Sequence, residues 1–357
     1  MSASEHAAPE VLAAHEVLAA PEVLFEIRNL QTHFYTEAGT VRAVDDVSFD
    51  IHRGEVLGIV GESGSGKSVT CLSINRLIPD PPGRIVGGRI VYHKNGAPID
   101  LLTLSYEEMR RFRGQDIGMI FQEPMTSLNP VFTIGMQMTE SVRYHRNISK
   151  QEAFGLGVDM LKLVGIPAPE KRMGDYPHQF SGGMRQRVMI AMALVCNPAL
   201  LIADEPTTAL DVTIQAQILQ LMLQMKEKRQ EASIVLVTHD LAVVAETCER
   251  VIVMYGGHIQ EVAGSHDIFN APAHPYTRGL LGSLPRPDKE RRRRLETIRG
   301  AVPSMLEMPA GCRFCTRCDN VMDHCRSLVP ELVSLSPTHQ VRCHLYANDA
   351  KLRGENA

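Results

Sequence analysis

The sequence predicts an α/β protein in which parallel strands bring several polar residues together at one edge of a sheet. Three observations support this fold class. A buried strand runs into a glycine-rich turn and a helix, two further apolar strands end in charged or histidine residues, and a cysteine-rich segment follows near the end of the chain. At 357 residues, the chain is long enough for one large domain and a smaller one.

Composition and charge exclude several classes of protein. The net charge of −4 lacks the basic excess of most nucleic-acid-binding proteins, so no nucleic-acid partner is expected. No apolar run reaches the roughly 18 residues that a membrane-spanning helix needs. Residues 1–24 lack the basic start and continuous apolar core of a signal peptide, and we expect a disordered N-terminal extension there.

The first strand and its turn predict a phosphate-binding loop. The run EVLGIV predicts a buried strand from Glu55 to Val60, and the residues from Ser68 onwards have helical composition. Between them, GESGSGKS matches a pattern in which backbone amides wrap the phosphates, the lysine binds the outer phosphates and the serine binds Mg²⁺. The expected nucleotide-binding residues are Gly61, Ser63, Gly64, Ser65, Gly66, Lys67, Ser68 and Val69.

Two further strands end in residues suited to nucleotide hydrolysis. The run ALLIADEP ends in Asp204, expected to hold Mg²⁺, and Glu205, expected to orient and deprotonate the attacking water. The run SIVLVTHD places His239 at the carboxyl end of another strand. Because the carboxyl ends of parallel strands share one edge of a sheet, His239 is expected beside the γ-phosphate. These residues predict a P-loop nucleotide hydrolase, without saying what work it performs.

A second anion-binding helix start lies between these strands. In HQFSGGMRQR, Ser181, Gly182 and Gly183 open a helix, and a helix N-terminus favours an anion. One nucleotide cannot easily use both helix starts of the same subunit. We therefore expect a head-to-tail dimer in which each subunit covers the nucleotide of the other.

With this segment, the chain resembles the ATP-binding subunits of ABC transporters, from about Leu24 to Tyr346. The resemblance implies that Gln122 contacts Mg²⁺ and the attacking water, and so joins Glu205 and His239 as a catalytic residue. It also implies that Asp211 lies in a loop crossing the dimer interface, and that Phe34 or Tyr35 stacks on adenine. The signature is FSGGM where the family usually has LSGGQ, but its serine and both glycines are intact, so we expect an active site.

The resemblance also implies the domain organisation. A P-loop ATPase core would span residues 25–264, with a RecA-like subdomain, an antiparallel β subdomain and a helical signature subdomain within roughly 75–200. A linker would follow at 265–300, then a small cysteine-rich extension at 301–346 and a tail at 347–357.

The C-terminal part suggests a branch of the family. HPYTRGLLGSLPRP and the later CHLY resemble the extension of peptide and nickel importer ATPases. The resemblance implies a subunit that hydrolyses ATP to drive import of di- or oligopeptides, bound peripherally at the cytoplasmic face of the inner membrane. Its implied partners are a second, different ATPase subunit, two membrane-spanning permease subunits and, indirectly, an extracytoplasmic solute-binding protein. Nickel or glutathione import, or a soluble ABC ATPase outside transport, are the alternatives.

Five of the eight cysteines lie in this extension, in GCRFCTRCDNVMDHC and VRCHLY. In a reducing compartment such a group predicts a metal site, and spacing alone permits zinc, an iron–sulfur cluster or no metal. The resemblance favours a 4Fe–4S cluster over zinc, with Cys315 as a spectator and a structural role, because the extension is poor in apolar residues. The implied ligands are Cys312, Cys318, Cys325 and Cys343.

Overall fold

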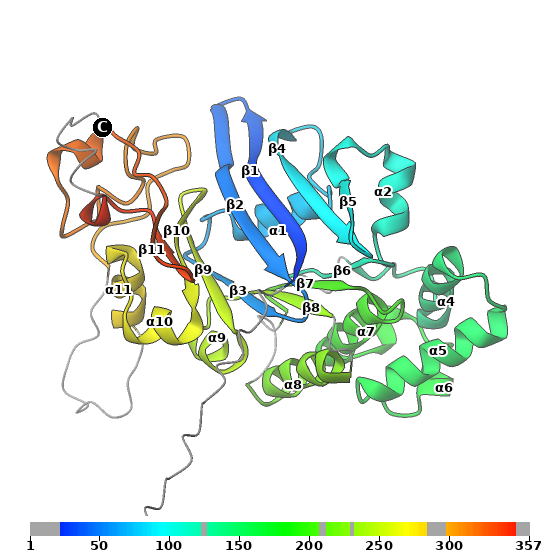
Figure 1. The fold of residues 1–357 in the computed structure, drawn as a ribbon. Coiled ribbons are helices and arrows are strands. Elements are labelled where there is room, and N and C mark those ends of the chain that lie inside the picture. The colour runs from blue at the N-terminus through cyan, green and yellow to red at the C-terminus, as the bar shows by residue number, and fades with distance from the viewer. Residues whose placement is uncertain (1–21, 123–126, 207–211, 229–231, 284–297, 348–357) are drawn as a thin grey trace, which may run out of the picture.

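Two β-sheets and the helices packed beside them make up the described part of the molecule (Figure 1). The structure is a computed structural model and describes residues 22–122, 127–206, 212–228, 232–283 and 298–347. Most of the expected N-terminal extension, Asp211 and nearly all of the tail lie outside the described residues.

The first sheet is antiparallel, with the strand order β2-β1-β4-β5. Its strands are β1 (Val23–Thr36), β2 (Gly39–His52), β4 (Gly83–Lys94) and β5 (Ala97–Asp100). The cross-strand pair of Phe25 and Tyr92 fixes β1 against β4, since their rings stack with centroids 4.6 Å apart.

The second sheet has the strand order β11-β12-β10-β9-β3-β8-β7-β6. Its parallel part contains β3 (Val56–Val60), β6 (Ile117–Ile120), β7 (Leu200–Asp204), β8 (Ser233–Val237) and β9 (Arg250–Tyr255). An antiparallel edge adds β10 (His258–Gly264), β11 (Val333–Ser336) and β12 (His339–Val341). Strands β3, β7 and β8 are buried along their whole length, which accounts for their continuous apolar runs.

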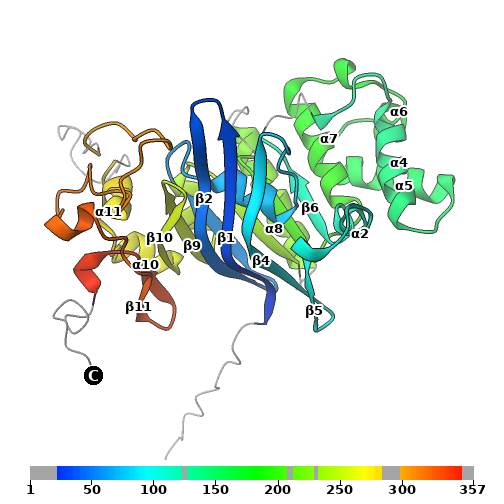
Figure 2. The ribbon, with the colours of Figure 1, turned by 90° about the horizontal axis from the view of Figure 1, so that it is seen from above.

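The helices are distributed around these sheets. The two that follow strands early in the chain are α1 (Lys67–Ile74) and α2 (Tyr106–Phe112), the latter after the short η1 (Leu101–Thr103). A helical group contains α4 (Ile134–His145), α5 (Lys150–Leu163), α6 (Pro169–Arg172), η2 (Pro177–Gln179) and α7 (Gly182–Leu194). The remaining elements are α8 (Val212–Lys228), α9 (Leu241–Thr247), α10 (Ser265–Asn270), α11 (Pro275–Gly282), η3 (Asp323–Arg326) and η4 (His344–Tyr346). In both views, the helical group and the C-terminal part lie at opposite ends of the sheets (Figure 2).

The second sheet separates two apolar layers. In β7, Leu200 and Ile202 join the cluster that contains the antiparallel sheet, whereas Leu201 and Ala203 join the cluster formed with α7, α8 and α9. Packing on both faces fixes the central strands. Their carboxyl ends are thereby held in place and can present side chains to a ligand.

The start of the helical subdomain differs from the prediction. Residues 83–100, expected within the helical region, form the strands β4 and β5. The glycine pair in GRIVGGRIVYHK produces an irregular register against β1, and Gly88 takes a φ of 100° where a Cβ would lie 2.6 Å from Leu30 Cα. This bulge interrupts the strand pattern in the sequence, so the helical group proper begins at α4.

The prediction of a linker at residues 265–300 is wrong for residues 265–282. The segment contains α10 and α11, and Ile268, Tyr276 and Leu281 are buried in the same apolar cluster as the helix-covered face of the sheet. The cysteine-rich extension is also continuous with the core, because its strand β12 pairs with β10. The basic run RPDKERRRRLETIRG predicts a linker, but the preceding HPYTRGLLG is helical, with Pro275 in the first turn of α11, where proline is tolerated.

Within the described residues, no helix has both the length and the apolar character required to span a bilayer.

Candidate active site

The phosphate loop joins β3 to α1 and is confined by two neighbouring strands. Gly61 has a φ of 151°, and a Cβ there would lie 2.2 Å from the carbonyl oxygen of Met254 in β9. Gly66 has a φ of 104°, and a Cβ there would lie 2.5 Å from the carbonyl oxygen of Ala43 in β2. Only glycine fits these two positions, and the close packing fixes the path of the loop.

Lys67 lies folded over this loop. Its buried ammonium group donates to the carbonyl oxygens of Gly61 at 2.8 Å and Glu62 at 3.0 Å. Burial lowers the pKa of Lys67, while the charges of Glu205 and Asp204 oppose that shift. A buried cation that donates to neutral carbonyl oxygens is well placed to exchange them for anionic phosphate oxygens.

Ser68 and Asp204 form a second, oxygen-rich pair. The Ser68 hydroxyl donates to Asp204 Oδ1 at 3.0 Å, joining the start of α1 to the end of β7. Burial raises the pKa of Asp204, the hydrogen bond from Ser68 lowers it, Glu205 raises it and Lys67 lowers it. A hydroxyl and a carboxylate are ligands that Mg²⁺ prefers, so the pair fits the predicted magnesium site.

Gln122 and His239 meet at one oxygen of Glu205. Gln122 Nε2 donates to Glu205 Oε2 at 3.0 Å, and His239 Nδ1 lies 3.6 Å from the same oxygen. Glu205 follows β7 with a φ of 47°, and its amide donates to the carbonyl oxygen of Val237 at 2.9 Å. The structure thus brings together three residues that come from separate segments of the chain, and the left-handed backbone at Glu205 sets the direction of its carboxylate.

The signature segment lies in a different part of the subunit. Ser181 and Gly182 are exposed at the start of α7, which packs with α4 and α5 in the helical group (Figure 2). The Ser181 hydroxyl accepts from the amide of Met184 at 3.3 Å, and a Cβ on Gly182 would meet open space. The helix start is therefore capped locally and faces solvent, with Gly183 half-buried beside it.

Of the two aromatic candidates for adenine stacking, Phe34 packs against the neighbouring strand β4. The ring of Phe34 covers Gly83, where a Cβ would lie 2.7 Å from Phe34 Cε1. The side chain of Tyr35 is free to reach a ligand, since this residue is 54% exposed. The remaining predicted loop residues differ in burial. Ser63 and Gly64 are exposed, Ser65 is buried, and Val69 is half-buried on α1.

All five cysteines of the extension line one enclosed cavity. Cys312, Cys315, Cys325 and Cys343 are buried, Cys318 is half-buried, and all eight cysteines of the chain are free thiols. Burial raises the pKa of Cys312 to about 12 and that of Cys343 to about 11, and neighbouring thiols contribute to both shifts. The four implied ligands therefore lie together, and Cys315 lies with them.

Two histidines beside this cavity did not emerge from the sequence. Ligand atoms of His324, Cys325 and His344 lie within 4.8 Å of one another. His324 Nε2 is buried and has no hydrogen-bond partner among the described residues, whereas His344 Nε2 bonds to the carbonyl oxygen of Leu328 at 3.0 Å. The available signal was the adjacency of each histidine to a cysteine in DHC and CHLY.

A second contact missed by the sequence joins the extension to the phosphate loop. Arg317, between Cys315 and Cys318, forms an ion pair with Glu62 of the loop, with 2.5 Å between Arg317 NH1 and Glu62 Oε2. The two residues are far apart in the chain, so no local pattern indicates that they meet.

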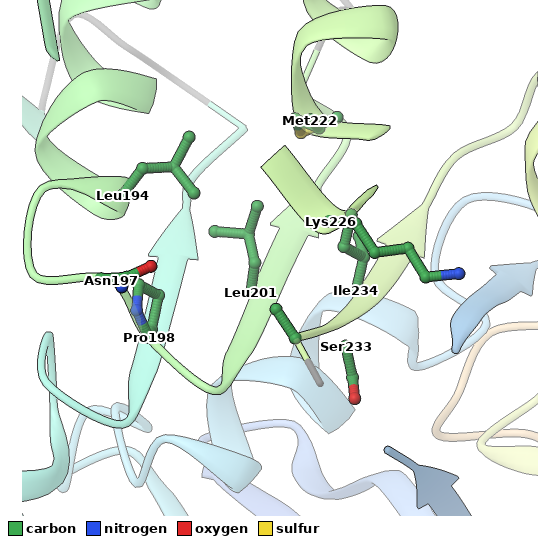
Figure 3. Close-up of a pocket in the computed structure, with 9 residues that line it drawn as sticks. Leu194, Asn197, Pro198, Leu201, Met222, Lys226, Ser233 and Ile234 are labelled. Atoms are coloured by element: carbon green, nitrogen blue, oxygen red, sulfur yellow. The ribbon is translucent and has the colours of Figure 1, made fainter. Parts of the chain in front are cut away.

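An apolar pocket lies at the other end of the strands (Figure 3). It is lined by Leu201 near the start of β7 and Ile234 near the start of β8, with Leu194 of α7 and Met222 of α8 opposite. Because Asp204 lies at the carboxyl end of β7, this pocket is not part of the site described above.

Two family profiles match the chain in succession. The family described as "ABC transporter" matches residues 44–208, and the family described as "Oligopeptide/dipeptide transporter, C-terminal region" matches residues 260–325.

Curated relatives align over nearly the whole chain. A probable peptide ABC transporter ATP-binding protein of Sinorhizobium fredii is 52% identical over 321 residues, which cover 90% of this chain and 94% of the relative. The dipeptide transport ATP-binding protein DppD of Bacillus subtilis is 50% identical over 335 residues, which cover 93% of this chain and 98% of the relative.

Solved structures match about two thirds of the chain. A dimeric ATP-binding cassette in a post-hydrolysis state, bound to ADP and Pi, has a TM-score of 0.60 and 28% identity over 68% of this chain and 99% of that chain. The cbiO1 protein from Clostridium perfringens, part of an ABC transporter complex, has a TM-score of 0.56 and 27% identity over 70% of this chain and 92% of that chain. These matches confirm the predicted α/β cassette fold.

Proposed function

The chain belongs to the ATP-hydrolysing subunits of ABC transporters that carry the oligopeptide/dipeptide C-terminal region, and on this premise we propose in detail how it powers peptide import. The convergence of Gln122 and His239 on Glu205 is the observation that carries the catalytic assignment. The match of residues 260–325 favours di- or oligopeptides over nickel or glutathione as cargo.

ATP binding begins with Lys67. The β- and γ-phosphate oxygens replace the carbonyl oxygens of Gly61 and Glu62 as its partners, and the backbone amides of residues 61–66 wrap the phosphates. Ser68, Asp204 and Gln122 would hold Mg²⁺, which supplies charge neutralisation at the phosphates. Tyr35 stacks on adenine, because its side chain is exposed while Phe34 covers Gly83.

Hydrolysis uses the carboxylate of Glu205. Glu205 orients a water and accepts its proton as the water oxygen bonds to the γ-phosphorus and the bond to the bridging oxygen breaks. Gln122 positions the carboxylate and the water from one side. His239 approaches from the other side and contacts the γ-phosphate, consistent with its 64% exposed side chain.

The second half of each site comes from another subunit. Ser181 and Gly182 face solvent and, with the half-buried Gly183, would meet the γ-phosphate of a partner ATPase subunit, in a head-to-tail arrangement. Asp211 lies outside the described residues and would cross this interface. A related but different subunit is the partner that we propose, giving a heterodimer.

Two membrane-spanning permease subunits would receive the motion of this dimer. The helical group around α4 would contact them, which places the chain peripherally at the cytoplasmic face of the inner membrane. A solute-binding protein on the other side would deliver the peptide and would act on this chain only through the permeases.

We also propose that the cysteine cavity holds a 4Fe–4S cluster through Cys312, Cys318, Cys325 and Cys343. The donor set fits, since soft thiolates converge on one enclosed cavity and no disulfide competes for them. A bound cluster would stabilise the thiolates that burial alone disfavours and would crosslink the extension. The alternative is zinc, for which His324 and His344 offer nitrogen ligands beside Cys325.

The test of peptide import is reconstitution. The chain is co-purified with its permeases and partner ATPase in proteoliposomes, and uptake of labelled dipeptide, nickel and glutathione is compared with and without ATP. ATP-dependent uptake of the peptide alone is expected. Uptake of nickel or glutathione in its place would overturn the cargo, and failure to co-purify with any membrane subunit would overturn transport.

A further inference from the structure

Glu62, the second residue of the phosphate loop, has each of its polar groups bound. Its amide donates to the Tyr276 hydroxyl at 2.8 Å, and its carbonyl oxygen accepts from Lys67 at 3.0 Å. Its carboxylate accepts two hydrogen bonds from Arg317, at 2.5 and 3.1 Å. Its carbonyl oxygen also accepts from the amide of Ser65 at 3.2 Å. Two of these four partner residues come from the chain beyond the ATPase core, Tyr276 from α11 and Arg317 from the cysteine-rich extension.

Arg317 is fixed in the orientation that this contact needs. Its side chain is 4% exposed, and its Nε donates to the carbonyl oxygen of Arg299 at 3.1 Å. The guanidinium lies 5.8 Å from the ring centroid of Tyr255 and 6.0 Å from that of Phe314. Two parallel donors on one carboxylate form a bidentate pair, which fixes direction as well as distance.

The charge of Glu62 needs such a partner. The carbonyl oxygen of Glu62 accepts from Lys67 at 3.0 Å, so the two residues are in contact and the charge of Glu62 acts on the phosphate-binding lysine. An unpaired carboxylate here would compete with the phosphates for Lys67 and would repel them. Arg317 neutralises that carboxylate, since both of its oxygens accept from the guanidinium.

We propose that Arg317 is a positioning residue for the ATP site, through which the cysteine-rich extension holds the phosphate loop by Glu62. The proposal rests on ATP binding at this loop, as proposed above. It assigns the extension a role in nucleotide affinity as well as in its own stability. By reciprocity, bound ATP would hold the extension more firmly in place.

The test is a double-mutant cycle on ATP affinity in the full-length chain. With a fluorescent ATP analogue, Arg317→Gln is expected to raise the Kd about tenfold, because it leaves the Glu62 charge unpaired. Combining it with Glu62→Gln is expected to recover most of that loss, because both charges are then absent. Arg317→Lys, which keeps the charge without the bidentate contact, is expected to bind with intermediate affinity and serves if Arg317→Gln does not fold.

Arg313→Gln is the matched control. Arg313 lies in the same extension, has a similarly buried side chain, and pairs with Asp45 of β2 at 2.8 Å rather than with the loop. Its loss is expected to lower the unfolding temperature while leaving the Kd for the analogue within about twofold. Equal weakening by Arg313→Gln and Arg317→Gln would overturn the proposal, as would a double variant no better than Arg317→Gln.

The same measurements distinguish failure of the proposed ATP site from failure of the proposed role of Arg317. A wild-type chain that does not bind the analogue would contradict the proposed function itself. A wild-type chain that binds it, beside an Arg317→Gln variant of equal affinity, would overturn only the role of Arg317.

Discussion

The ATP site and the cysteine-rich extension are built in opposite ways. Most side chains of the ATP site follow the ends of β3, β7 and β8, strands that are buried along their whole length, and Gln122 follows β6, so the sheet itself fixes their positions. Residues 298–332 of the described chain contain one short helix, η3, before β11, and the five cysteines of the extension meet in one cavity. One region is positioned by strands of the central sheet, whereas the other is held by the packing of Phe314 against Tyr255 and Tyr276, by polar contacts and, as proposed, by a metal cluster.

The largest effect is expected at the ATP site, from Glu205→Gln. The amide keeps the size of the side chain but cannot accept the proton of the attacking water, so ATPase activity of the assembled complex should fall by at least about 100-fold. The Kd for ATP should stay close to that of wild type, since Lys67 and Ser68 are untouched. Near-normal turnover would show that Glu205 is not the base.

In the extension, the matching experiment replaces single cysteines by serine. Cys312→Ser should abolish the brown colour and reduce iron from about four per chain to near zero, because a 4Fe–4S cluster requires four thiolates. Cys315→Ser, in the same cavity, should retain the iron if Cys315 is a spectator. Iron and sulfide assays on anaerobically purified protein measure the cluster content of both variants. Stoichiometric zinc on colourless wild-type protein would contradict the cluster, and zinc loss in a His324→Ala variant would then identify the histidine site.

The contrast also explains how far the sequence could predict the molecule. Ser68, Asp204, Glu205 and His239 each follow a short buried run, and the rule that parallel strands end at one edge places them together. No comparable rule joins Glu62 to Arg317, which lie 255 positions apart. Residues 83–100 lie within the segment predicted as helical but form strands, whose pattern is interrupted by the glycine bulge of β4. The linker predicted at 265–300 contains Tyr276, which is fully buried.

A smaller effect is expected from the two aromatic residues at the end of β1. Tyr35→Ala should weaken ATP binding by about 1 kcal/mol through lost stacking on the base, with little change in stability. Phe34→Ala should do the reverse, because its ring packs over Gly83 in the sheet. Nucleotide titration and thermal unfolding of both variants separate these outcomes. Weaker ATP binding in Phe34→Ala alone would exchange the roles of the two residues.

The smallest effect concerns the attachment of the extension and depends on pH. His258, whose Nε2 lies 3.7 Å from Asp45 Oδ2, lowers the pKa of Asp45, burial opposes this, and the charges of Arg313 and Arg42 lower it further. A carboxyl group whose pKa is lower in the folded state stabilises the fold above its unfolded pKa of about 4, and this contribution is lost as the pH falls through the folded value. Asp45→Asn should therefore reduce the free energy of unfolding by about 0.5–1 kcal/mol at neutral pH. The difference from wild type should shrink below about pH 4, where Asp45 itself becomes protonated. Denaturant unfolding at both pH values measures it, and a difference that does not change with pH would mean that packing, rather than the charge of Asp45, holds the extension to β2.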